Sequence, residues 1–111
     1  MLNIIIAPNR TLGALRTVAE YRDRIQKKLS TALSPVELVI SDDSHLHAGH
    51  AGAHIDGRGE THFSIRIVSD AFDGETRVAR HRRIYAILAS ELKERVHALS
   101  LTTLTELELN S

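Results

Sequence analysis

The sequence predicts a single α+β domain, with elements in the order α-β-β-α-β-α and the strands in one small sheet. Three observations lead to this fold class. The length of 111 residues suits one domain. The spacing of apolar residues alternates along the chain between the three-to-four step of a helix and the two-step of a strand. Pro35 and Gly74 stand between segments of different period, as residues that end helices and make turns do.

The first helix is expected to begin at Thr17. Thr17 and Glu20 have the spacing of a capping box, with Thr17 as N-cap and Glu20 three residues later. Pro35 marks the end of the helix. One face of it is expected to carry apolar side chains at spacings of three and four: Val18, Tyr21, Ile25, Leu29 and Leu33. Residues 1–16 are expected to be a flexible N-terminal extension, with the domain over residues 17–111.

Two strands are expected next. The segment 36–40 is rich in β-forming residues, and 62–69 alternates, with Phe63, Ile65 and Ile67 on one side. Between them, residues 41–60 are polar and contain four glycines. Loops of this length in small domains are usually functional or disordered.

The second half of the chain predicts a turn at Asp73-Gly74 and a helix from Arg77. Residues 97–101 alternate and predict a third strand. Residues 103–106 could cap a short final helix. The buried stripe of the second helix is expected to consist of Val78, His81, Tyr85, Leu88 and Leu92.

Composition excludes several classes of protein. The chain has no cysteine, so it offers no disulfide, thiol nucleophile or thiolate ligand of its own. Its formal net charge is zero, so binding to nucleic acid would need a local basic patch. No stretch approaches the roughly 20 apolar residues of a membrane span. We therefore expect a cytoplasmic protein (mitochondrial if the source is a eukaryote) that does not enter membranes.

The segment HLHAGHAGAH, residues 45–54, contains four of the seven histidines. Three interpretations are open. It is a solvated loop, it uses a single imidazole, or it holds a metal through two of them, such as His47 with His50 or His50 with His54. No CxxC or HExxH pattern accompanies the segment, so the spacing alone does not choose among them.

The segment RVARHRR, residues 77–83, places four arginines and one histidine at the start of the second helix. Helix N-termini attract anions, so Arg77, Arg80, Arg82 and Arg83 could contact phosphates. The alternative is a solvated face on which Arg77 and Arg83 pair with carboxylates such as Asp73 and Glu75. His81 lies on the predicted apolar stripe, which favours a hydrogen-bonded core or boundary histidine over a ligand.

The remaining polar candidates give weaker signals. Asp42, Asp43 and Glu60 could act as acids or bases, or could be solvated loop carboxylates. No nucleophile with an adjacent base accompanies them, so the chain is not expected to be an enzyme. His97 is expected at the first position of the third strand.

Four stretches together resemble the BolA family: DDSHLHAGHAG, GETHFSIRIVSDAFDG, ARHRRIYAILASEL and VHALSL. The likeness covers about residues 18–105. It implies a fold like the class II KH domain, with three strands in a mixed sheet and helices packed against it. The chain departs from the family near its C-terminus, where residues 103–107 lack the Thr-Pro and Trp that many members carry.

The resemblance also implies a function. BolA-like proteins bind monothiol glutaredoxins and share a bridging 2Fe–2S cluster with the partner and glutathione, in iron–sulfur trafficking and iron regulation. The implied ligands are His97 and a loop histidine, His47, with His50 as the alternative. The cluster is not expected to be needed for folding, and the chain alone is expected to be a monomer or weak homodimer. Some bacterial members are DNA-binding regulators of stress response and cell morphology, a role for which residues 77–83 would supply the contacts.

Overall fold

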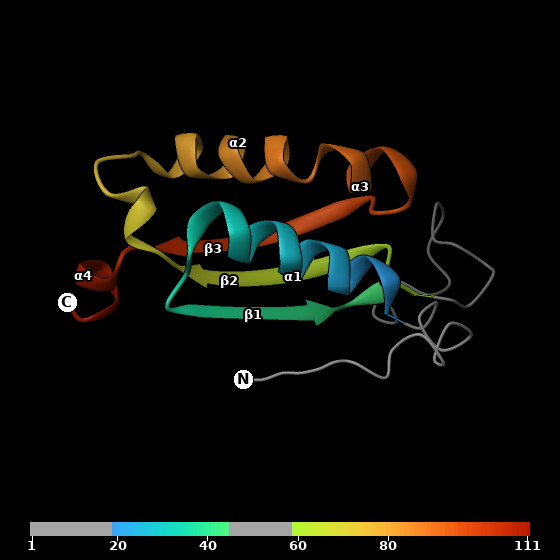
Figure 1. Ribbon diagram of the computed structural model, residues 1–111, viewed down its shortest axis with the longest axis horizontal. Helices are drawn as coiled ribbons and strands as arrows, with labels where there is room; N and C mark the ends of the chain where they lie inside the picture. The colour runs from blue at the N-terminus through green and yellow to red at the C-terminus, as the bar shows by residue number, and fades with distance from the viewer. Residues whose placement is uncertain (1–18, 45–58) are drawn as a thin grey trace.

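The computed structural model describes residues 19–44 and 59–111, and it shows an α+β domain with one three-stranded sheet (Figure 1). The predicted order of helices and strands is confirmed, with a short 3-10 helix added and the second helix divided in two. The elements are α1 Glu20–Leu33, β1 Glu37–Asp42, β2 His62–Val68, η4 Asp70–Phe72, α2 Arg77–Ile87, α3 Ala89–Glu94, β3 Ala98–Leu104 and α4 Glu106–Leu109.

The sheet is mixed, as expected from the resemblance. Its strand order is β1-β2-β3, with β1 antiparallel to β2 and β2 parallel to β3. Ile40 pairs with Ile65, and His62 pairs with Ala98. The end of β1 therefore meets the starts of β2 and β3 at one end of the sheet, while α4 lies at the other end (Figure 1).

One face of the sheet is covered by helices, and the core lies between the two layers. The alternation predicted for β2 is confirmed, because Phe63, Ile65 and Ile67 are buried while the residues between them are half-buried. The core cluster is formed by residues of α1, β1, β2, η4 and α2 and by residues on either side of α3. Its members are Ile25, Leu29, Leu33, Ile40, Phe63, Ile65, Ile67, Phe72, Ile84, Leu88 and Val96. Within the described residues, no helix is both long and apolar enough to cross a membrane.

The start of α1 differs from the prediction. The helix begins at Glu20, and Ala19 stands at the N-cap without a side-chain cap. The predicted capping box is therefore wrong, and Thr17 itself lies outside the described residues. Glu60 takes over the cap: its carboxylate oxygens accept the backbone N–H groups of Tyr21 at 3.3 Å and Arg22 at 3.0 Å. A cap from a distant segment leaves no local pattern in the sequence.

The buried face of the second helical region also differs from the prediction. Val78 is 57% exposed and Tyr85 is 43% exposed, so these two members of the predicted stripe do not face the core, whereas Leu88 is buried and Leu92 packs against the core as predicted. The buried residues are Arg80, Ile84, Leu88 and Glu91. Hydrophobic periodicity fails here because two of the inward-facing side chains are charged and are neutralised by partners from other elements.

Three boundaries move by one or two residues. The first strand is shifted toward Asp42, and the third begins at Ala98, so His97 precedes it. The final helix is capped by Thr105, whose side chain accepts the N–H of Glu108 while Glu108 caps Thr105 in return. The predicted cap over 103–106 thus lies two residues too early.

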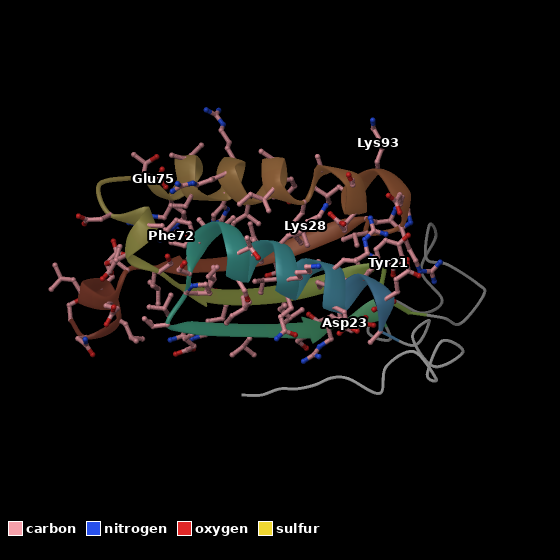
Figure 2. The ribbon with its side chains drawn as sticks, in the orientation of Figure 1. Tyr21, Asp23, Lys28, Phe72, Glu75 and Lys93 are labelled. Atoms are coloured by element: carbon pink, nitrogen blue, oxygen red, sulfur yellow. The ribbon has the colours of Figure 1, made fainter. Side chains whose placement is uncertain are left out.

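Glu91 joins α1 to α3 through a buried charge cluster. Its carboxylate is fully buried and accepts hydrogen bonds from Arg24 and Lys28, each at 2.9 Å. Burial alone would raise the pKa of Glu91, but the hydrogen bond from Lys28 and the nearby positive charges hold the pKa below its ordinary value. Arg24 also pairs with the exposed Glu94 at 2.9 Å. Figure 2 shows Lys28 and Tyr21 on the helical side of the sheet, beside this cluster.

Two ion pairs with exposed carboxylates predict loss of stability in acid. Hydrogen bonds from Arg24 to Glu94 and from Arg80 to Glu108 lower the pKa of each carboxyl to about 2. A lowered folded-state pKa stabilises the ionised form, so this contribution is complete above the ordinary pKa of about 4.3 and disappears as the pH falls toward 2. We expect the urea midpoint to fall between pH 5 and 2.5, and to fall less in Glu108→Gln. An identical pH dependence in that variant would contradict the assignment.

Candidate histidine site

His97 lies exposed in the turn between α3 and β3, and its backbone is fixed by the start of β2. The carbonyl oxygen of Thr61 accepts the N–H of His97 at 2.7 Å and the N–H of Ala98 at 3.3 Å. The preceding residues are anchored as well. Val96 is buried in the core, and the Nε of Arg95 donates to the Gly59 carbonyl at 2.8 Å. The imidazole of His97 therefore extends from a rigid backbone toward solvent.

A second histidine lies beside His97. The ring centroids of His62 and His97 are 6.4 Å apart, and the rings are inclined by 49°. His62 opens β2, and its Nδ1 lies 2.9 Å from the hydroxyl of Thr61. His62 is half-buried on the side of β2 opposite to Phe63, and sequence reasoning gave it no role. Its closeness to His97 follows from the parallel pairing of β2 with β3, which the periodicity of a single strand does not reveal.

The residues that flank segment 45–58 are hydrogen-bonded to each other beside these histidines. The Ser44 hydroxyl oxygen accepts the N–H groups of Thr61 at 2.7 Å and His62 at 3.2 Å. The carboxylate of Asp42 accepts the N–H groups of Ser44 and Glu60, each at 2.9 Å. The loop histidines predicted as ligands, His47 and His50, lie outside the described residues, as do His45 and His54. Among residues 19–44 and 59–111, no three histidine, aspartate or glutamate side chains are grouped to hold a metal ion.

The three candidate acids have structural roles. Asp42 closes the base of the segment, and Asp43 accepts hydrogen bonds from Ser41 and from Ser64. Glu60 is 5% exposed and caps α1. The prediction that these three carboxylates are solvated loop groups is therefore wrong. The carboxylate of Glu60 accepts hydrogen bonds from two backbone N–H groups of α1.

Glu60 also has a strained backbone, which gives a paired prediction. Its φ of 63° is in the left-handed region, which costs a residue other than glycine about 1–3 kcal/mol. Glu60→Ala should lower the free energy of unfolding by about 1–2 kcal/mol, since it removes the cap of α1 and keeps the strain. Glu60→Gly should cost less, because glycine adopts this φ freely. Urea denaturation of both variants tests this, and equal losses would contradict it.

The arginine-rich segment divides into two engaged and two exposed side chains. Arg80 is buried and donates to the Thr103 carbonyl at 3.0 Å and to Glu108 at 2.6 Å. Arg83 donates to the Ala71 carbonyl at 2.8 Å and pairs with Glu75 at 3.2 Å, so the predicted pairing with Glu75 is confirmed. This burial argues against Arg80 as a phosphate contact.

Arg77 and Arg82 are exposed on α2. The N-terminal end of α2 lies at the end of the domain opposite to the start of β3, as Glu75 in Figure 2 and the ribbon in Figure 1 show. His81 is half-buried, and its Nε2 has no hydrogen-bond partner in the part of the chain that the structure describes. His81 therefore lies at the boundary of the core, as predicted, but within the described residues its Nε2 lacks the predicted hydrogen bond.

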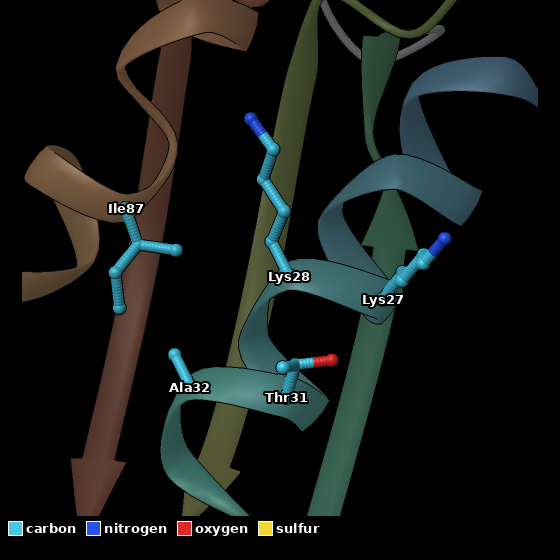
Figure 3. Close-up of a pocket in the computed structure, with 5 residues that line it drawn as sticks. All are labelled: Lys27, Lys28, Thr31, Ala32 and Ile87. Atoms are coloured by element: carbon cyan, nitrogen blue, oxygen red, sulfur yellow. The ribbon is translucent and has the colours of Figure 1, made fainter.

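A separate groove of about 500 Å³ runs between α1 and α2 (Figure 3). Its lining is Lys27, Lys28, Thr31, Ala32 and Ile87. None of the histidines or arginines predicted from the sequence contributes to it. The groove is therefore distinct from both candidate sites.

Comparison with known proteins identifies the family. The sequence pattern of the family described as "BolA-like protein" matches residues 29–108. The chain belongs to the BolA-like protein family. BolA-like relatives include SufE-like protein 1 of Arabidopsis thaliana, 51% identical over 88 residues, which cover 78% of this chain and 24% of that protein. The solved BolA domain of that protein aligns with a TM-score of 0.69 over 78% of this chain and 92% of the domain.

Two further BolA-like relatives are a chloroplast protein and a bacterial regulator. Protein BOLA1, chloroplastic, of Arabidopsis thaliana is 48% identical over 77% of this chain and 53% of its own length. The DNA-binding transcriptional regulator BolA of Escherichia coli K12 is 46% identical over 76% of this chain and 74% of its own. The chain thus spans about a quarter and about half of the two plant relatives, and most of the bacterial one.

Proposed function

We propose that this chain is a non-enzymatic BolA-like adaptor that binds a monothiol glutaredoxin and shares a bridging 2Fe–2S cluster with it and with glutathione. The observation that supports this most is the position of His97. Its imidazole is exposed on a backbone anchored at Thr61, at the end of the sheet where the histidine-rich segment leaves and returns.

The donor set fits a shared cluster. Such a cluster takes four donors, usually thiolates, and this chain has no cysteine. Sulfur must therefore come from the partner and from glutathione, while this chain supplies imidazole. We propose His97 as one ligand and His47, or alternatively His50, as the second.

Imidazole ligation would suit transfer or sensing. Replacing thiolate by histidine raises the reduction potential of a 2Fe–2S cluster, and an imidazole must be neutral to bind. The residues of this chain would orient the cluster and release it, without forming a covalent intermediate. We propose iron–sulfur trafficking or iron regulation as the process, in a reducing compartment such as the cytoplasm or, in a eukaryote, an organelle.

The test is to mix the chain with a cluster-loaded monothiol glutaredoxin and record visible absorption and circular dichroism. We expect a spectrum that differs from that of the glutaredoxin alone, and we expect His97→Ala to abolish the difference. His81→Gln is the matched control and should keep it. His47→Ala and His50→Ala then identify the second ligand. A His97→Ala complex with the parent spectrum would refute the ligand assignment.

DNA binding is the second candidate function. It is favoured by the exposed side chains of Arg77 and Arg82 on α2 and by the bacterial relative named as a DNA-binding regulator. Because α2 begins at the end of the domain opposite to the start of β3, one chain could carry both functions on different parts of its surface.

A mobility-shift titration tests the DNA-binding candidate. Binding should weaken steeply with salt, and Arg77→Ala with Arg82→Ala should weaken it further and reduce the salt slope. The absence of salt-sensitive binding at micromolar protein would argue against this function, as would an unchanged slope in the double variant.

A further inference from the structure

We propose that α4 of one chain docks into the groove between α1 and α2 of a second copy, so that the chain self-associates through two different surfaces. The proposal stands on two complementary features of the same chain. One is the groove, which has apolar side chains and a lysine at its rim, and the other is a short helix with exposed leucines beside an acidic residue. The contact requires neither a glutaredoxin nor a cluster.

The groove offers apolar contact next to a positive charge. Figure 3 shows Ala32 and Ile87 on the facing sides of α1 and α2, with Lys28 between the helices and Lys27 on the outer side of α1. The ammonium of Lys28 donates to the buried carboxylate of Glu91 at 2.9 Å and is neutralised there. Lys27 is exposed, and no carboxylate of the described residues pairs with it. The charge of Lys27 is therefore available to a partner.

The helix α4 offers the matching chemistry. Leu107 is 79% exposed and Leu109 is 38% exposed, and both side chains are open to contact. The carboxylate of Glu108 is engaged with Arg80, but that of Glu106 is exposed and has no ion pair in the part of the chain that the structure describes. Exposed leucines beside an unpaired acid complement apolar side chains beside an unpaired lysine in both hydrophobicity and charge.

The α4 of one chain is held away from the groove of the same chain. The backbone N–H of Glu106 donates to Asp70 at 2.9 Å, and Glu108 pairs with Arg80 at 2.6 Å. These bonds fix α4 at the end of the domain where β3 ends, whereas the groove lies between α1 and α2 over the sheet (Figure 1). The contact therefore joins two chains. It is heterologous, because the two surfaces that meet are different.

A contact of this size predicts weak association. Four residues of α4 bury less area than a stable dimer interface does, so the contact belongs to the weak, transient class. Burial of Leu107 would supply most of the affinity. The pair of Lys27 with Glu106 would mainly fix the orientation, since exposed ion pairs contribute little. We expect the free and associated chains to exchange between micromolar and millimolar protein.

The test is an NMR titration of the full ¹⁵N-labelled chain with the unlabelled chain. The amide resonances of residues 27–32, Ile87 and residues 106–109 should shift with concentration. Leu107→Ser should weaken association about tenfold or more, since burial of one leucine side chain is worth about that factor. Val78→Ser is the matched control and should associate as the parent does, because Val78 is 57% exposed and belongs to neither surface.

An exchange of charges tests the orientation. Lys27→Glu and Glu106→Lys should each weaken self-association, because each variant brings like charges together in the contact. A mixture of the two variants should restore association, since the exchanged charges then attract each other. Urea denaturation of each variant checks that it is folded.

Several outcomes would overturn the proposal. They are an absence of concentration dependence at millimolar protein, shifts outside the two surfaces, equal weakening in Val78→Ser, and no recovery in the mixture of charge variants. Groove amides that respond to an unrelated acidic, leucine-containing peptide and not to the chain would assign the groove to a different partner, and would overturn it as well. Because no glutaredoxin is present, the result is independent of the test of cluster sharing.

Discussion

Replacing Arg24 and Lys28 together by methionine is expected to lower the free energy of unfolding by about 3–5 kcal/mol at pH 7. The reason is that Glu91 is fully buried and these two cations donate to its carboxylate at 2.9 Å each. Without them a buried charge is left uncompensated. The loss should shrink as the pH is lowered toward 4, because burial without a cation raises the pKa of Glu91 and protonation then relieves the cost.

Urea denaturation measures this effect, and a third substitution sharpens it. Adding Glu91→Leu to the double variant should recover much of the lost stability, since an apolar side chain removes the unpaired charge. Glu94→Gln is the control, because Glu94 is an exposed partner of Arg24 and exposed pairs contribute about 0–1 kcal/mol. A double variant within about 1 kcal/mol of the parent would show that the cluster is not stabilised as described.

Arg80→Ala is expected to cost about 3 kcal/mol, because it leaves two backbone carbonyls without their donor. The guanidinium donates to the carbonyls of Glu75 and Thr103, each at 3.0 Å, and pairs with Glu108. It thereby ties α2 to the end of β3 and to α4. The matched control is Arg82→Ala, which lies on an exposed position of the same helix and should change stability by no more than about 0.5 kcal/mol.

The same two variants separate loss of the fold from loss of surface contacts in DNA-binding experiments. A variant of Arg80 that loses DNA binding together with stability would report on the fold, and only Arg77 and Arg82 report on the exposed surface. Equal stability of Arg80→Ala and Arg82→Ala in urea would contradict the structural role of Arg80.

Local patterns predicted the elements whose buried sides are apolar. The alternation around Ile65 and the helical spacing of Ile25, Leu29 and Leu33 were enough to place β2 and α1. In these segments burial and hydrophobicity coincide, so a periodicity in the sequence corresponds directly to a face in the fold.

The pattern failed where tertiary contacts decide burial. Arg80 and Glu91 face inward because distant partners neutralise them, and apolar Val78 is left exposed on the same helical region. The cap of α1 comes from Glu60, some forty residues away in sequence. Neither feature has a local signature that could have revealed it.

The ligands of the candidate site stay predictions, and the structure adds a neighbouring histidine to them. His97 was singled out by family resemblance and its role as a ligand stays a prediction; the structure places it exposed on an anchored backbone. His62 was missed, because its closeness to His97 depends on the parallel register of β2 and β3. His47 and His50 stay predictions, since they lie outside the described residues.

The most direct test of the central claim asks whether a nitrogen of this chain binds iron. The chain, labelled with ¹⁵N-histidine, is combined with cluster-loaded monothiol glutaredoxin, and the cluster is reduced for pulsed EPR. Cluster sharing predicts strong hyperfine couplings to ¹⁵N that weaken or disappear in His97→Ala and persist in His81→Gln. A reduced cluster without strong ¹⁵N couplings, or with couplings unchanged in His97→Ala, would contradict the claim that His97 is a ligand.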